Sequence, residues 1–96
     1  MTIQIDPESM ETKYLHRFAD FNGKRVLEIG CGDGRLTWRY ANSAKFTAGI
    51  DLNAEELRVA TIDRPADLAV SFVRADSIHI PFSKEKFDIA ILAWSL

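Results

Sequence analysis

The sequence lacks the features that mark disulfide-rich, membrane-spanning and nucleic-acid-binding proteins. Cys31 is the single cysteine in 96 residues, so an internal disulfide is excluded and a reducing, cytoplasmic setting is expected. The longest apolar run, from Ile89 to Trp94, is far shorter than the roughly 18 residues that a membrane helix needs. The 12 basic and 14 acidic residues leave a formal net charge of −2, which gives no basis for binding nucleic acid or an acidic membrane.

What is present is enough for one ordinary globular domain. Apolar residues make up 47% of the chain, a typical value for a protein with a packed core. Two domains would each hold fewer than about 50 residues, the low end of what can bury a core. We therefore expect residues 1–96 to form a single domain.

Apolar segments alternate with helical patterns along this domain. Helices are predicted over residues 7–20, 35–42 and 54–63, the last with Asn53 as its N-cap and Glu56 closing a capping box. Short apolar strands are predicted over residues 25–29, 46–50, 70–75 and 87–94. This alternation predicts an α/β fold in which a parallel sheet is covered by helices on both faces. Right-handed crossovers predict the strand order 3-2-1-4.

The last predicted strand has no polar alternation and nothing after it in the sequence to cover it. An apolar strand with a free edge favours self-association. We therefore expect the chain to be a fragment, truncated after its fourth strand. The alternative is a compact domain whose edge is covered by the N-terminal helix or by a second copy.

A glycine-rich turn follows the first predicted strand, in the stretch Glu28-Ile29-Gly30-Cys31-Gly32-Asp33-Gly34. Glycines at this spacing let the backbone turn sharply and let a ligand lie against the main chain. The dinucleotide fingerprint requires a glycine where Arg35 stands, and the Gly-Lys-Ser/Thr of a P-loop is absent. The turn therefore predicts a ligand site of another kind.

The stretch from Val26 to Gly34 resembles the first motif of the class I S-adenosylmethionine-dependent methyltransferases. The sequence also resembles later motifs of this family, in the order the family has them and closest to its small-molecule, methyltransferase type 11-like branch. These stretches are Gly49-Ile50-Asp51-Leu52-Asn53, Ala75-Asp76-Ser77, Ile80-Pro81-Phe82 and Phe87-Asp88-Ile89-Ala90. Four segments in order are more specific than a glycine loop alone. The resemblance implies a Rossmann-like sheet and covers only the cofactor-binding half of the family's fold.

The resemblance implies that the glycine turn binds the methionine moiety of S-adenosylmethionine. Gly30, Cys31, Gly32 and Gly34 would hold that moiety against the backbone. Glu28 would orient its amino or carboxylate end. Ala93 and Trp94 would border the methyl group.

The resemblance also assigns residues to the nucleoside. Asp51 would accept hydrogen bonds from both ribose hydroxyls, and charged acceptors form the stronger bonds. Leu52 would pack on the adenine ring. Asp76 would accept from the adenine amino group while the backbone of Ser77 reads a ring nitrogen.

Several of these residues also have a purely structural interpretation. Asp51 and Asp76 are common turn residues at strand ends, and Gly34 can serve close helix packing. Cys31 is expected to be a packed side chain, because no base lies near it in the sequence. His16 and His79 belong to no recognisable metal or catalytic arrangement, so no metal ligand and no general base is predicted.

The sequence thus predicts methyl transfer from S-adenosylmethionine to a small-molecule acceptor. Two alternatives stay open at this stage. One is a non-catalytic cofactor-binding or scaffold domain that pairs with another chain. The other is a different enzyme on the same fold, such as an aminopropyl transferase or a nucleotide-binding oxidoreductase.

Overall fold

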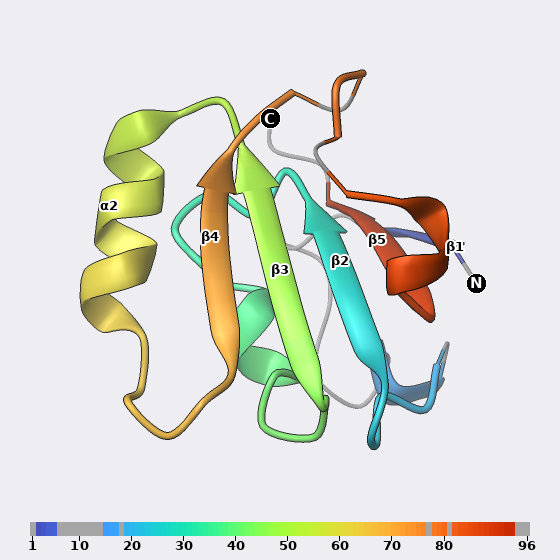
Figure 1. The fold of residues 1–96 in the computed structure, drawn as a ribbon. Helices are drawn as coiled ribbons and strands as arrows, with labels where there is room; N and C mark the ends of the chain where they lie inside the picture. Colours follow the sequence, from blue (N-terminus) through green and yellow to red (C-terminus); the bar gives the residue numbers. More distant parts are fainter. Residues whose placement is uncertain (1, 6–14, 18, 77, 81, 94–96) are drawn as a thin grey trace.

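The fold centres on one parallel sheet, seen in a computed structural model that describes residues 2–5, 15–17, 19–76, 78–80 and 82–93 (Figure 1). The strands are β1 (Thr2–Ile5), β2 (Arg25–Ile29), β3 (Phe46–Asp51), β4 (Val70–Arg74) and β5 (Ile89–Ala93). They lie in the order β1-β5-β2-β3-β4, and every neighbouring pair is parallel. The predicted order of the last four strands, 3-2-1-4 in the sequence numbering, is confirmed as β4-β3-β2-β5.

The strand β1 is a feature that the sequence analysis missed. It pairs with β5 in a register that runs from Thr2 opposite Ala90 to Ile5 opposite Ala93. The expectation of a free edge on the last strand is therefore wrong. That edge is covered by an N-terminal strand, and neither a helix nor a second copy is needed. Thr2-Ile3-Gln4-Ile5 does alternate polar and apolar residues, a short strand signal that the sequence analysis did not use.

Helix α2 (Ala54–Asp63) begins where the sequence predicts. The Asn53 side chain accepts hydrogen bonds from the backbone N–H groups of Glu55 and Glu56, both at 3.1 Å. The predicted capping box is wrong, because the Asn53 N–H donates to Asp51 Oδ1 at 2.8 Å and not to the Glu56 carboxylate. Asp51 therefore links the end of β3 to the start of the helix.

The helix predicted over residues 35–42 is reduced to the 3-10 turn η1 (Thr37–Arg39), flanked by irregular turns. Thr37 and Tyr40 direct their hydroxyls toward a buried carboxylate on β2, and neither residue type favours an α-helix. Of the helix predicted over residues 7–20, residues 15–17 are helical. Its segment 7–14 and residue 18 lie outside the described residues.

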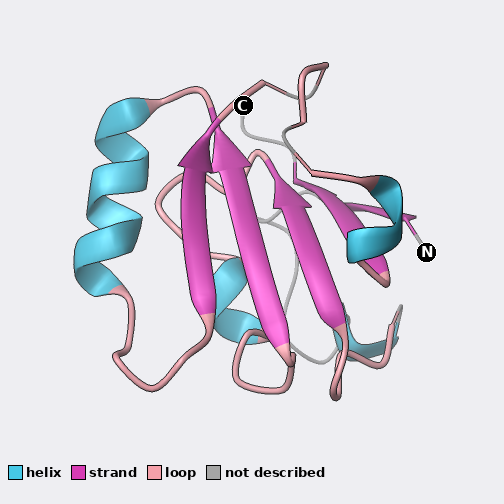
Figure 2. Ribbon diagram, in the orientation of Figure 1, coloured by secondary structure: helices cyan, strands magenta, loops and turns pink. Residues whose placement is uncertain are grey.

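The two faces of the sheet are covered unequally. On one face, Val26, Ile89 and Ile91 pack with Leu36 and Tyr40, which flank η1. On the other face, a second cluster includes Leu27 and Ile50 together with Phe82 and Phe87, which flank the short turn η2 (Lys84–Lys86). Figure 2 shows these two turns on opposite sides of the strands, with α2 beside β4. Helical segments thus lie on both faces as predicted, but among the described residues the second face carries only a turn and a loop.

The parallel arrangement places the carboxyl ends of β2, β3 and β4 at the same edge, where their arrowheads lie together in Figure 1. The glycine turn directly follows β2, Asp51 is the last residue of β3, and Asp76 lies two residues after the end of β4. Among the residues that the structure describes, no helix is long and apolar enough to cross a membrane.

Candidate functional site

The glycine turn is fastened to the end of β3. The backbone N–H groups of Gly30 and Cys31 both donate to the carbonyl of Ile50, at 2.8 and 3.1 Å. The φ angles of Gly30, Gly32 and Gly34 are +80°, +55° and +88°. Residues other than glycine rarely adopt this left-handed conformation, so the shape of the turn itself requires glycines.

Protein atoms also lie where side chains at these three positions would project. A Cβ at Gly30 would lie 2.6 Å from the Ala93 carbonyl oxygen, and one at Gly32 would lie 2.6 Å from Glu56 Oε2. A Cβ at Gly34 would lie 2.8 Å from the indole of Trp38. The helix-packing interpretation of Gly34 is therefore confirmed. Contact between the turn and a ligand stays a prediction.

Asp51 links the glycine turn to α2. Its Oδ2 atom accepts from the Gly32 N–H at 2.9 Å, and its Oδ1 atom accepts from the Asn53 N–H. A carboxylate oxygen has two lone-pair directions, so each oxygen keeps capacity for a further donor. The neighbouring Leu52 is 60% exposed. The pair thus offers a charged acceptor beside an accessible apolar surface.

Glu28 lies fully buried beneath the turn. Its Oε1 atom accepts from Thr37 Oγ1 at 2.8 Å and from the Tyr40 hydroxyl at 2.5 Å. Its Oε2 atom is buried and has no hydrogen-bond partner among the described residues. Burial raises the pKa of Glu28 to about 7, against the opposing effect of the hydrogen bonds from Tyr40 and Thr37. Glu28 therefore carries an unused acceptor and titrates near neutral pH.

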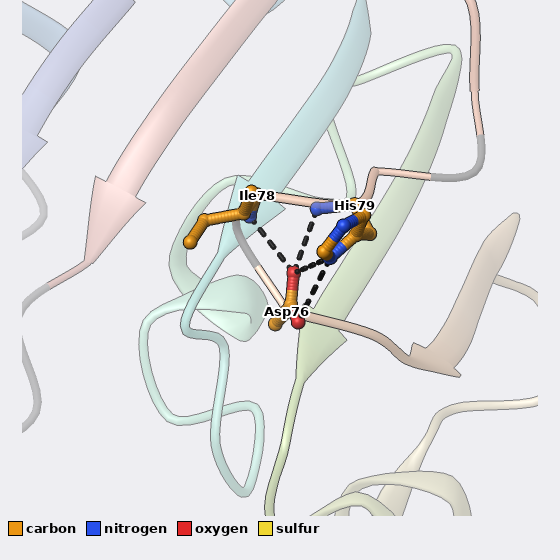
Figure 3. Close-up of polar contacts among 3 residues, drawn as sticks. All are labelled: Asp76, Ile78 and His79. Atoms are coloured by element: carbon orange, nitrogen blue, oxygen red, sulfur yellow. Dashed lines mark hydrogen bonds and ion pairs between the residues drawn. The ribbon is translucent and has the colours of Figure 1, made fainter.

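Asp76 forms a tight turn after β4 (Figure 3). Its Oδ1 atom accepts from the N–H groups of Ile78 at 2.9 Å and His79 at 2.7 Å. The imidazole Nδ1 of His79 lies 3.1 Å from the same oxygen and 3.3 Å from Oδ2. The backbone hydrogen bond from His79 contributes most to lowering the pKa of Asp76. Asp76 thus has the turn role allowed by the sequence, together with a histidine partner that was not predicted.

Cys31 is packed as expected. The residue is buried, and a Cβ added at Gly49 would lie 2.9 Å from its Sγ atom. Burial, followed by the nearby charge of Glu28, raises the pKa of the thiol far above its ordinary value. A thiol that stays protonated in this way is not poised for attack on a substrate.

The predicted site residues do not all fall within the described part of the chain. The structure brings Gly30 into contact range of Ala93 and joins Gly32 to Asp51, while Asp76 lies at the next strand end. Ser77 and Trp94 lie outside the described residues. Within the described ranges, no group of three or more His, Cys, Asp or Glu side chains could hold a metal ion.

The sequence analysis missed two features near this edge. One is the pair of hydrogen bonds that Thr37 and Tyr40 donate to the Glu28 carboxyl, which depends on a tertiary contact between β2 and the segment around η1. The other is a groove of about 490 Å³ on the second face of the sheet, lined in part by apolar side chains. Its lining includes Leu27, Ile29, Ile80, Phe82, Phe87 and Ala90.

An open parallel sheet with a glycine turn and a strand-end carboxylate at its carboxyl edge defines an α/β domain of the nucleotide-cofactor-binding class. The sequence profile of a family described as "Methyltransferase domain" matches residues 26–96, which is most of the chain. The chain belongs to this family, within the class I S-adenosylmethionine-dependent methyltransferases.

Individual relatives agree with this assignment. The chain is 33% identical over 92 residues to a phthiotriol/phenolphthiotriol dimycocerosates methyltransferase of Mycobacterium leprae, covering 90% of this chain and 33% of that protein. It is 40% identical over 81 residues to a ubiquinone/menaquinone biosynthesis C-methyltransferase of Pseudomonas savastanoi, covering 77% of this chain and 31% of that protein. The chain therefore spans about a third of the length of these curated relatives.

Solved structures show the same fold. An S-adenosylmethionine dependent methyltransferase from Mesorhizobium loti matches with a TM-score of 0.75 and 25% identity, over 93% of this chain and 42% of that one. The phosphoethanolamine N-methyltransferase 1 of Haemonchus contortus, solved with phosphoethanolamine and S-adenosylhomocysteine, matches with a TM-score of 0.78 over 88% of this chain and 18% of that one. At 20% identity, this second likeness concerns the fold alone.

Proposed function

We propose that residues 1–96 form the cofactor-binding half of an S-adenosylmethionine-dependent methyltransferase domain that acts on a small-molecule acceptor. The observation that carries the proposal is the Asp51 carboxylate, which is hydrogen-bonded to the glycine turn beside the exposed Leu52. A nucleoside needs such a combination, because its vicinal hydroxyls donate hydrogen bonds and its base offers an apolar face.

The residues present fit S-adenosylmethionine at both ends. The buried, unpartnered Oε2 atom of Glu28 suits an amino group on the methionine side, next to the turn formed by Gly30, Cys31, Gly32 and Gly34. On the nucleoside side, Asp51 would accept from the ribose and Leu52 would contact the adenine, with Asp76 and the Ser77 backbone at the adenine edge. Ala93, which closely approaches Gly30, and Trp94 would border the methyl group.

The chemistry asked of this chain is mainly positioning. When bound, S-adenosylmethionine supplies a methyl group already activated on a sulfonium. The chain's own residues then hold the donor in one orientation and keep water away from it. We assign no general base and no other catalytic residue.

The proposal extends to the acceptor and the location. A small-molecule acceptor is supported by the two relatives named for ubiquinone/menaquinone biosynthesis and for phthiotriol/phenolphthiotriol dimycocerosates. The balanced net charge of −2 argues against nucleic acid or an acidic membrane as partner. The lone, buried Cys31 suits the cytoplasm. Self-association through the edge of β5 loses its basis, because β1 occupies that edge.

Calorimetric titration with S-adenosylhomocysteine tests the proposal. Asp51→Ala should weaken binding by about 1.5–3 kcal/mol, roughly tenfold to a hundredfold, because charge-assisted hydrogen bonds to the ribose are lost. Asp51→Asn, which keeps the side-chain shape, serves if the alanine variant does not fold. Asp67→Ala, at an exposed carboxylate in the loop between α2 and β4, is the matched control and should bind normally.

Two results of this titration would contradict the proposal. Equal affinity in the Asp51 variants would remove Asp51 from the site. Tighter binding of NAD than of S-adenosylhomocysteine by the unaltered chain would favour a nucleotide-binding oxidoreductase.

A further inference from the structure

We propose that Glu56 is a specificity-determining residue of the cofactor site, its negative charge favouring the cationic donor S-adenosylmethionine over S-adenosylhomocysteine, the product with no net charge. The inference deepens the proposed function and rests on it, because it takes the glycine turn to be the place where the donor binds. The sequence analysis gave Glu56 only a capping role, and the partner of the Asn53 N–H is Asp51 instead.

The Glu56 side chain lies against the middle of the glycine turn. Its Oε2 atom would be 2.6 Å from a Cβ added at Gly32, so the carboxylate covers that side of the Gly32 backbone. α2 begins at the edge of the sheet where β3 and β4 end, which brings its first turn to this place (Figure 1). Glu56 is half-buried here, whereas its neighbour Glu55 is exposed. The Glu56 carboxylate thus belongs to the candidate site.

Two further carboxyl groups flank the same part of the turn. Asp51 Oδ2 accepts from the Gly32 N–H at 2.9 Å, so two carboxylates meet at one glycine. Glu28 lies buried beneath the turn with its unpartnered Oε2 atom. Burial raises the pKa of the adjacent Cys31 thiol most, and the charges of these three carboxyl groups each raise it further. Negative charge is therefore concentrated around the middle of the turn.

The basic side chains near the start of α2 have other partners. Arg58 forms an ion pair with Glu55 at 2.8 Å, and Arg74 donates to the carbonyl of Leu52 at 2.9 Å. Within the described part of the chain, no side chain forms a hydrogen bond or an ion pair with the Glu56 carboxylate. Its charge is therefore available to a cation bound at the turn.

The methyl donor and its product differ in charge at one atom. S-adenosylmethionine carries a sulfonium, an ammonium and a carboxylate, and loss of the methyl group turns the sulfonium into a neutral thioether. The sulfonium joins the methionine moiety to the ribose, so the proposed site places it between the glycine turn and Asp51, which are themselves joined at Gly32. A carboxylate at Gly32 therefore attracts the donor more than the product, and it favours release of the product after transfer. Solvent and salt screen this attraction, so we expect a preference of about threefold.

The experiment is calorimetric titration of the 96-residue chain with S-adenosylmethionine, S-adenosylhomocysteine and sinefungin, which has an ammonium-bearing carbon in place of the methylated sulfur. Glu56→Gln, which keeps the side-chain shape, should weaken binding of the two cationic ligands about threefold and leave S-adenosylhomocysteine binding unchanged. The ammonium and carboxylate of the methionine moiety are common to all three ligands, so their contributions cancel in this comparison. The difference should vanish in about 1 M salt, where the screening length is about 3 Å. Glu56→Asp retains the charge and should retain the preference.

Glu55→Gln is the matched control. It removes the same charge one residue away, from an exposed side chain paired with Arg58, and should leave all three affinities unchanged. Equal weakening of the three ligands by Glu56→Gln, no change in any of them, or tighter binding of all three would overturn the role of Glu56 and leave the proposed function standing. Failure of the unaltered chain to bind S-adenosylhomocysteine would overturn both.

Discussion

Glu28 gives the fold a dependence on pH that its surface charges do not predict. The ordinary pKa of the group is 4.5, and burial raises it to about 7 in the folded protein. The folded state therefore binds the proton more tightly than the unfolded chain does. The stability that Glu28 contributes is complete below about pH 4.5 and is lost as the pH rises through about 7.

Replacing the Glu28 carboxyl should remove this pH dependence of the free energy of unfolding. Glu28→Gln keeps an oxygen to accept from Thr37 and Tyr40 but cannot ionise, so its free energy of unfolding should change little between about pH 5 and 8. Near pH 8 the variant should be more stable than the unaltered chain by up to about 3 kcal/mol. Urea unfolding followed by circular dichroism across this range measures both quantities. If the free energy of unfolding changed with pH by the same amount in both proteins, Glu28 would not be the cause of the change.

Only part of the candidate site could be predicted from the sequence. The glycine turn and Asp51 each belong to a motif that is local in the sequence, so the sequence alone places them at the ends of strands. The hydrogen bonds that Thr37 and Tyr40 donate to Glu28 join separate elements, and no spacing rule reveals them. His79 follows Asp76 by three residues, a spacing typical of a side-chain turn, but the imidazole contact depends on the path of a loop.

The glycine turn and η1 pack so closely that adding one methyl group at Gly34 should push them apart. Gly34 lies against the Trp38 indole, whereas Gly23, with a φ of +69°, has nothing within 4 Å of its added Cβ. Gly23→Ala should therefore cost only the backbone strain, about 1 kcal/mol, while Gly34→Ala should cost about 2–4 kcal/mol. Thermal unfolding of the two variants gives the comparison. Equal losses of stability in the two variants would show that the Trp38 side chain can move away from a Cβ at position 34 at no energetic cost.

Burial explains which of the secondary-structure elements could be predicted from the sequence. β2, β3 and β5 were predictable because largely buried strands read as mostly apolar runs. β4 is an edge strand in which Ser71 and Arg74 are exposed, and it was predictable from its three apolar residues. The turn η1 was not, since its geometry is set by hydroxyls directed at Glu28 and by the indole against Gly34. The start of α2 was predicted by Asn53, but the partner of the Asn53 N–H is Asp51, which the strand–helix connection brings close.

The sheet as a whole relies on β1 to cover β5. Ile3 is buried in the same cluster as Val26 and Ile91, and its strand supplies backbone partners to the outer edge of β5. Removing residues 1–5 should expose that edge, lower the stability and raise the apparent mass in sedimentation velocity relative to the full chain. Thr2→Ala, at an exposed side chain of the same strand, should leave both unchanged. An unaltered sedimentation profile after the deletion would show that β1 does not protect the edge.

The pairing of β1 with β5 also sets the order in which the chain can fold. These strands are the first and the last along the described residues, yet they lie side by side in register. Closing so long a loop costs entropy that shorter connections avoid, so β2, β3 and β4 have the advantage in forming early. During synthesis, β1 leaves the ribosome long before its partner exists. The sheet therefore cannot be completed until β5 has emerged between β1 and β2, and that step is expected to limit the folding rate.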